Sequence, residues 1–250
     1  MDKGIIMKNL LLALSCLLFA NLAIASSHNG IYISSKIGVS VLNMYDSKFE
    51  YSNEKKSDFR ALKFNDKSHP AFGNFIGIGY DFYDQFSVPI RTELEVGMRG
   101  KVSDTHSLNA LSTVPNSSAD MKNEATLTTL MLNGYYDMKN QTAFMPYISF
   151  GLGLASTRYE NTQHSEFEIF GLKQNSNQSR SERINKLAWS LGMGGRYAFS
   201  DNLSFDLGYR FTEAGKYKIS MPNSFDKDAT DTSTINLASH DFMFGVVYRF

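Results

Sequence analysis

The chain has 250 residues, in which 25 Lys and Arg balance 25 Asp and Glu, and its mean hydropathy is −0.27. This length fits one large β-barrel as well as two ordinary domains. The balanced charge argues against a nucleic-acid-binding protein, which carries a basic excess on one face. Only the N-terminus comes close to an apolar membrane helix, which excludes a multi-helix transporter.

The first 25 residues have the pattern of a secretory signal peptide. Lys3 and Lys8 give a positive end, residues 10–20 form an apolar centre, and Ala23 and Ala25 form a small-residue exit. A permanent helical anchor is the alternative, which the small-residue exit disfavours. Cleavage after Ala25 removes the single cysteine of the chain, so the exported chain has no disulfide. We therefore predict one mature domain over residues 26–250.

The mature chain contains eight segments in which apolar side chains occupy alternate positions. In the clearest segment, Val88, Ile90, Leu94, Val96 and Met98 share one face. A period of two indicates strands rather than helices, and about ten residues suffice to cross a bilayer. The eight segments are residues 31–41, 72–82, 88–99, 130–138, 144–155, 187–199, 203–211 and 241–250.

The second face of these segments distinguishes a barrel from a soluble β-sandwich, which also alternates. It is rich in Gly and Ser and carries six residues of each charge. A narrow barrel lumen suits this composition, because small residues leave room for filling side chains and opposite charges pair. We therefore predict a lumen ion-pair network of Lys36, Asp81, Arg91, Glu93, Glu95, Arg99, Asp137, Arg196, Asp206, Arg210, Asp241 and Arg249.

The connections alternate between short and long. Three short ones (residues 83–87, 139–143 and 200–202) face four long ones, over residues 43–70, 100–124, 157–185 and 213–236. This alternation is typical of outer-membrane barrels, whose long loops lie outside the cell. The predicted fold is all-β, an eight-stranded antiparallel up-and-down transmembrane β-barrel with four long external loops. An aromatic girdle is expected at the short-turn rim, from Tyr80, Phe82, Phe86, Tyr136, Phe144, Tyr197, Phe199, Tyr248 and Phe250.

The strand motifs resemble those of the opacity-type outer-membrane proteins, which include the neisserial opacity adhesins. The matching pieces are residues 32–34, 91–95, 132–137, 146–148, 188–192, 206–210 and 248–250. The resemblance covers the strands and implies a porin-like barrel of the bacterial outer membrane, several members of which are adhesins. Tyr248 and Phe250 also resemble the C-terminal signal that the barrel assembly machinery reads.

The sequence offers little for catalysis. Its five histidines are scattered without metal-ligand spacing, so we expect no metal and no cofactor. Ser239, His240 and Asp241 suggest a catalytic triad, but adjacent residues of a strand point to opposite faces. We expect His240 near the outer rim instead, and we predict that the protein is not an enzyme.

The long loops are where we expect binding. Their charges sum to −1, and the candidate ligand contacts are Lys55, Lys56, Arg60, Lys63, Phe167 and Phe170. The sequence favours adhesion to host or neighbouring cell surfaces, with a receptor or glycan as partner and no nucleic acid. Further expected partners are outer-membrane lipid, lipopolysaccharide and the barrel assembly machinery. A low-conductance pore for ions or small solutes is the alternative, and an outer-membrane enzyme is a more remote one.

Overall fold

The computed structural model describes residues 30–53, 55–109, 118–169, 172–223 and 226–250. The predicted signal peptide, residues 1–25, lies outside the described residues. No described helix is both long and apolar enough to cross a membrane, a finding that concerns helices alone. The elements are β1 (Ile31–Asn53), β2 (Asp58–Lys63), β3 (Lys67–Asp81), α2 (Tyr83–Phe86), β4 (Ile90–Arg99), β5 (Val102–Ser107), β6 (Ser118–Asp137), β7 (Phe144–Ile169), β8 (Leu172–Ala198), β9 (Leu203–Pro222) and β10 (Ala229–Arg249).

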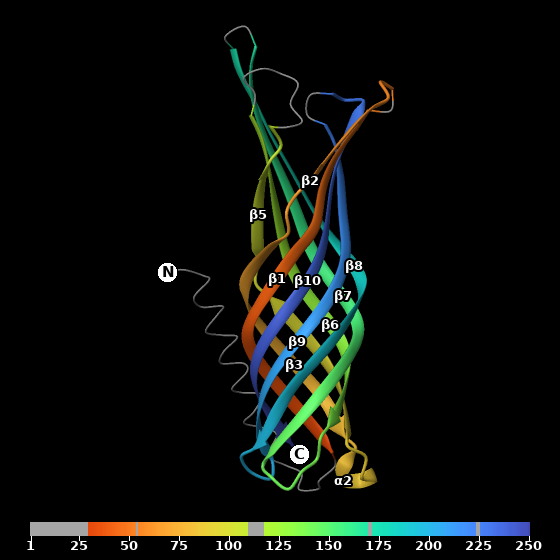
Figure 1. Cartoon of the computed structure of the whole chain (residues 1–250), viewed down its shortest axis with the longest axis vertical. Coiled ribbons are helices and arrows are strands. Elements are labelled where there is room, and N and C mark those ends of the chain that lie inside the picture. Colours follow the sequence, from red (N-terminus) through yellow and green to blue (C-terminus); the bar gives the residue numbers. More distant parts are fainter. Residues whose placement is uncertain (1–29, 54, 110–117, 170–171, 224–225) are drawn as a thin grey trace.

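The strands form one closed antiparallel barrel (Figure 1). Each strand pairs with its neighbours along the chain, and β10 pairs with β1 from Tyr32↔Arg249 onward, which closes the ring. β2 and β3 both pair with β1 and together form one barrel strand. β4 and β5 both pair with β6 and form another, so the ten strands make a ring of eight. The predicted eight-stranded up-and-down barrel is confirmed. Closure leaves no free edge at the level where lipid surrounds the strands.

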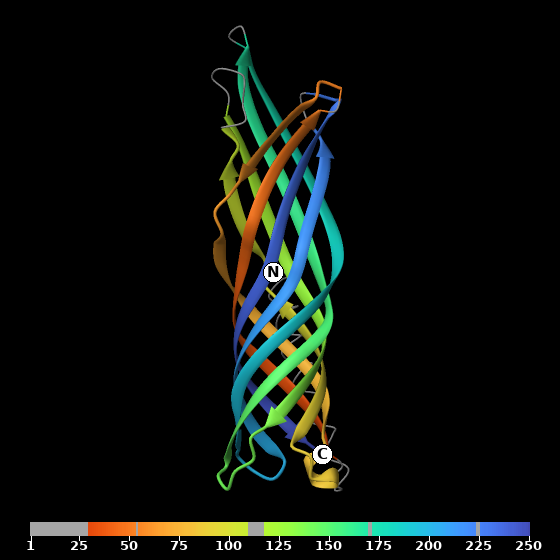
Figure 2. The ribbon, with the colours of Figure 1, turned by 45° about the vertical axis from the view of Figure 1, so that its right-hand side comes forward.

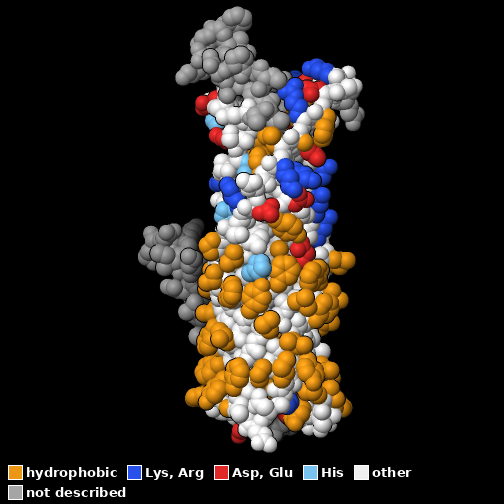
Figure 3. All heavy atoms as spheres, viewed as in Figure 1, with side chains coloured by type: hydrophobic (Ala, Val, Ile, Leu, Met, Phe, Trp, Pro, Cys, Tyr) orange, Lys and Arg blue, Asp and Glu red, His pale blue; other side chains and the backbone are white. Residues whose placement is uncertain are grey.

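An apolar belt covers the lower part of the barrel on the face that Figure 3 shows. Outward side chains such as Ile37, Leu132, Leu191 and Phe244 are half or more exposed, as lipid-facing residues must be. The predicted aromatic girdle lies at the short-turn rim, where Tyr80 contacts Phe82 and further aromatic pairs follow. The belt is thus the part of the barrel that lies in the membrane.

The predicted long loops are mostly strand, which corrects the expected boundaries. β1 continues to Asn53, and β7 pairs with β8 without interruption from Phe144↔Tyr197 to Ile169↔Leu172. The long strands continue upward as paired hairpins (Figures 1 and 2), above the apolar belt that Figure 3 shows. We call this part the hairpin extension and define it as the described residues within 42–69, 100–128, 155–188 and 212–239.

The hairpin extension divides into two sheets. β8 and β9 pair only as far as Trp189↔Glu213, and β3 and β4 only as far as Gly73↔Arg99. Beyond these points β2, β1, β10 and β9 form a first sheet, and β5, β6, β7 and β8 form a second sheet. The two sheets enclose an apolar core of Leu42, Met44, Val102, Ala125, Leu127, Met131, Ala155, Tyr159, Ala188, Ala214, Tyr217, Ile219, Met221, Ile235 and Leu237.

Candidate functional site

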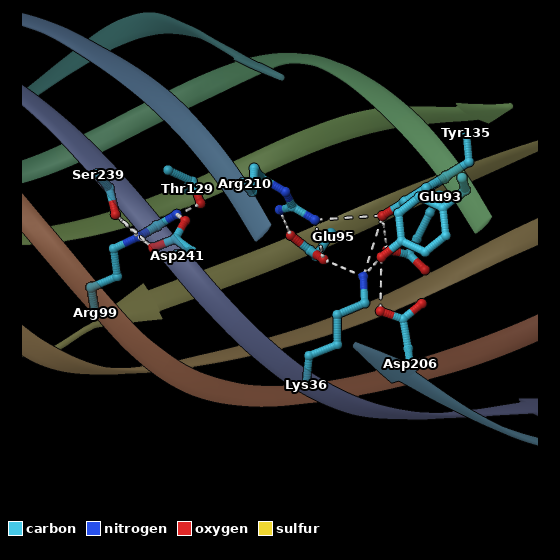
Figure 4. A network of polar contacts seen from close by, with 11 residues as sticks. Lys36, Glu93, Glu95, Arg99, Thr129, Tyr135, Asp206, Arg210, Ser239 and Asp241 are labelled. Atoms are coloured by element: carbon cyan, nitrogen blue, oxygen red, sulfur yellow. Dashed lines mark hydrogen bonds and ion pairs between the residues drawn. The ribbon is translucent and has the colours of Figure 1, made fainter. Parts of the chain in front are cut away.

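The barrel lumen holds a layered network of buried ions (Figure 4). In the middle layer, Lys36 Nζ lies 2.7 Å from Glu93 Oε1 and 2.8 Å from Glu95 Oε2. Arg210 forms a bidentate contact with Glu95, and the Tyr135 hydroxyl donates to Glu93 at 3.0 Å. Every one of these ionic side chains is less than 5 % exposed. The layer is electrically neutral, with two cations and two carboxylates in contact.

The layer nearest the short-turn end contains the Arg91–Asp137 pair, in which Nε and Nη2 donate to the carboxylate at 2.7 and 2.9 Å. Arg196 lies 3.5 Å from the same carboxylate. At the rim, Arg249 contacts Asp81 at 2.8 Å. Asp206 was expected to form an ion pair. It instead accepts a hydrogen bond from the Tyr147 hydroxyl at 2.9 Å.

The outermost ionic layer consists of Arg99 and Asp241. Arg99 Nε and Nη2 lie 2.9 and 2.5 Å from the two oxygens of Asp241, and Nε also donates to Ser239 at 3.0 Å. All twelve residues of the predicted lumen set therefore face the barrel interior, and the structure pairs eleven of them with an opposite charge. The apolar core of the hairpin extension follows directly above this layer and lies across the end of the lumen.

The Ser239-His240-Asp241 sequence does not assemble into a triad. Ser239 and Asp241 point into the lumen and hydrogen-bond each other at 2.6 Å. His240 lies on the outer surface, where the Tyr209 hydroxyl is 2.7 Å from its Nδ1 and the Phe211 ring packs against it. Among the described residues there is also no group of three or more His, Cys, Asp or Glu that could hold a metal ion.

The four predicted loop cations each contact a carboxylate. Lys55 and Lys56 reach Asp228 and Asp226 at 2.7 and 2.8 Å, which joins the β1–β2 turn to the connection between β9 and β10. The hydrogen bond from Lys56 lowers the pKa of Asp226 to about 2. Arg60 pairs with Asp58 and Lys63 with Asp46, at 2.6 and 3.0 Å. These four cations are thus held in local ion pairs.

The structure places the backbone of one of the two predicted aromatic contacts. Phe167 belongs to β7, opposite Gln174 of β8, and Phe170 lies outside the described residues. The candidate assembly residues Tyr248 and Phe250 pack edge to face at the short-turn rim, with ring centroids 5.3 Å apart. The outer ends of β1, β2 and β7, where the described candidate ligand contacts lie, are at the opposite end of the molecule from the rim that carries Tyr248 and Phe250 (Figure 1).

The sequence interpretation did not identify two features of the hairpin extension. One is a buried polar contact between the sheets, in which the Tyr159 hydroxyl donates to Asn123 and lies 2.6 Å from Ser233. The other is a row of outward lysines, described below. Both lie in segments interpreted as loops. Apolar residues in alternation there, such as Tyr217, Ile219 and Met221, were the available signal for strands.

Comparison with known proteins assigns the chain to a family. Residues 10–250 match the family described as outer membrane protein beta-barrel domain. The chain belongs to this family. It is a bacterial outer-membrane protein with its long hairpins outside the cell, and the expected relationship to small opacity-type barrels is confirmed.

Individual relatives agree with this assignment. Outer membrane protein PagN of Salmonella typhimurium is 37 % identical over 91 % of this chain and 93 % of its own length. A Rickettsia conorii protein named "Putative adhesin RC1281" is 25 % identical over 79 % of this chain and 76 % of its own. The outer membrane protein OprG of Pseudomonas aeruginosa has the same fold, with a TM-score of 0.55, 16 % identity and coverage of 90 % and 99 %.

Proposed function

We propose that this outer-membrane barrel is a surface adhesin that binds other cells through its hairpin extension. The observation that carries the proposal is that the extension is a folded structure with its own buried core, held far outside the apolar belt. A binding surface built on paired strands loses little conformational entropy when a partner docks, and this favours high affinity. The adhesin name of the Rickettsia relative supports the same role.

The interior does not favour the small-solute pore. Side chains fill an eight-stranded barrel, and here three ionic layers are followed by an apolar core. Ions would have to break buried pairs and then pass a cluster of packed apolar side chains. The triad residues likewise do not support an enzyme, because His240 lies on the opposite face of β10 from Ser239 and Asp241.

The test is cell adhesion by a non-adherent bacterium that displays the full barrel or a shortened hairpin. In the first variant residues 160–181 are replaced by Asn-Gly, which joins Tyr159 to its partner Glu182 and keeps the β7–β8 register. In the second variant residues 221–231 are replaced in the same way, which joins Ser220 to Thr232. We expect at least one variant to lose most of the adhesion that the full barrel confers.

Both variants need a check of folding and display, because β6 loses part of its pairing in the first. Surface antibody labelling and the fluorescence of Trp189, the single tryptophan, serve this purpose. If both correctly folded variants adhere as well as the full barrel, the extension is not the adhesive element and the proposal fails.

A further inference from the structure

The outer surface of the first sheet carries a row of lysines just beyond the apolar belt. Lys48 of β1 lies opposite Lys63 of β2 and Thr234 of β10, and Thr234 lies opposite Lys218 of β9. Lys216 occupies the next outward position of β9 toward the belt. Figure 3 shows basic side chains gathered directly above the belt on this face. We call Lys48, Lys63, Lys216 and Lys218 the lysine row.

The lysine row is only partly neutralised. Asp46 lies 3.0 Å from Lys63 and 3.9 Å from Lys48. Among the described residues, it is the one carboxylate that forms a salt bridge with a lysine of this row. Lys216 and Lys218 are exposed and have no salt-bridge partner among the residues that the structure describes. Like charges placed directly opposite in neighbouring strands destabilise a sheet, so Lys48 and Lys63 cost stability unless anions lie close to them.

A notch of about 360 Å³ lies beside the lysine row on the same face. Ala238 forms part of its lining, together with Tyr45, Lys67, Phe211 and Glu213. The Tyr45 hydroxyl is 2.9 Å from both carboxylate oxygens of Glu213, which fixes these two walls. The notch is large enough for a sugar ring, and carboxylates and hydroxyls are suitable partners for sugar hydroxyls.

The lining of the notch continues into the lipid-facing surface. Phe211 belongs to both the notch and the belt, and His240, Tyr209 and Phe242 pack together immediately below it. From the membrane outward, this face therefore presents an apolar surface, a polar notch and a group of cations. A phosphorylated glycolipid presents acyl chains, sugars and phosphates in the same order.

We infer that this face binds a phosphorylated glycolipid of the surrounding outer leaflet, the lipid A part of lipopolysaccharide. Acyl chains lie along Phe211 and Phe242, a sugar occupies the notch beside Ala238, and phosphates contact Lys216, Lys218 and Lys48. Complementary charge and the unbroken connection to the belt select a membrane lipid as the occupant. The inference depends on the outer-membrane location and not on the proposed adhesion.

The experiment measures binding of lipid A with two phosphates to the full mature barrel in detergent micelles. The test variant is Lys48→Gln/Lys216→Gln/Lys218→Gln, and the matched control is Lys55→Gln/Lys56→Gln/Lys227→Gln, which removes the same charge far from the belt. Each lysine near an anionic surface contributes about fivefold in affinity, so we expect the test variant to lose on the order of 100-fold. The control should stay within about threefold of the unaltered barrel.

Two further arms separate phosphate recognition from other causes. Lipid A without phosphates should bind the unaltered barrel at least about tenfold more weakly, because the lysines then have no anion to contact. Ala238→Leu, which fills the notch and keeps every lysine, should weaken lipid A binding by about tenfold.

Three results would overturn the inference. They are a test variant that binds as tightly as the unaltered barrel, a control that loses as much as the test variant, and binding of a soluble sulfated polysaccharide in the absence of lipid A binding. Lys216 and Lys218 are exposed and the Lys48 side chain is 39 % exposed, so folding should be unaffected. The fluorescence of Trp189 verifies it.

Discussion

The middle layer of the lumen allows a quantitative test of the ion-pair network. Arg210 contacts Glu95 and the Tyr135 hydroxyl, and Glu95 is the carboxylate with which it forms a salt bridge. Glu95→Gln would therefore leave a buried guanidinium without a counter-charge. Removing one partner of a buried pair costs about 3–5 kcal/mol, because the remaining ion stays desolvated. We expect that loss in the free energy of unfolding.

The reverse substitution should cost less. Arg210→Met leaves Glu95 in contact with Lys36 at 2.8 Å, so the carboxylate keeps a cation and the expected loss is about 2–3 kcal/mol. The double variant Glu95→Gln/Arg210→Met retains the balanced pair of Lys36 and Glu93. It should be more stable than Glu95→Gln alone, with a coupling free energy of about 2 kcal/mol or more.

Urea unfolding of the barrel in lipid vesicles measures these differences. The single tryptophan, Trp189, is 40 % exposed on the outer face and moves from lipid to water on unfolding, so its emission reports the transition. Lys55→Gln is the control, because the exposed pair with Asp228 should contribute less than about 1 kcal/mol. If the losses of the two single variants simply add in the double variant, the buried ions do not act as a coupled network and the reasoning is wrong.

Three more predictions concern the lumen and the extension. Gly79→Ala should destabilise the barrel by about 1–3 kcal/mol in the same assay, because its Cβ would lie 2.3 Å from the Tyr32 ring; an unchanged barrel would contradict the close packing. Burial raises the pKa of Asp231 from 3.8 to about 6. Its contribution to the free energy of unfolding of the extension is therefore complete below about pH 4, and this contribution, at most about 3 kcal/mol, is lost as pH rises through 6. Hydrogen exchange near the end of β9 should show this loss in the unaltered barrel and not in Asp231→Asn; equal pH dependence in both would refute it. In planar bilayers the unaltered barrel should show no steady conductance, whereas an open current that changes on Arg91→Ala would favour the pore.

The membrane-spanning strands were predictable because lipid imposes one strict rule on them. Most outward residues between the rims are apolar because they face lipid, so the alternation in segments such as 88–99 keeps a constant phase and marks the strand directly. The charged residues of the other face were predictable as a set for the same reason. Their partners were not predictable, since Arg99 and Asp241 are 142 residues apart and meet only through barrel closure.

The conformation of the long connections was not predictable by the same rule, because the surroundings of the strands change. Beyond the belt the outward face meets water and the inward face meets the opposite sheet. β6 shows the change: Leu130 and Leu132 point outward to lipid, whereas Ala125 and Leu127 point inward and Lys122 points outward. A strand that leaves the membrane thus inverts its pattern, and a search for one constant phase ends the strand too early.

This inversion also determines what lies inside the molecule at each height. Within the belt most apolar side chains face lipid, so the interior holds the charged side chains, and buried ions then require partners. Beyond the belt the apolar side chains turn inward, so Leu42, Leu127 and Leu237 form part of an apolar core above the Arg99–Asp241 pair. Among the residues that the structure describes, the end of the barrel is therefore closed by the continuation of its own strands. Because the same strands that close it also form the external surface, a partner that binds the extension contacts a fixed sheet.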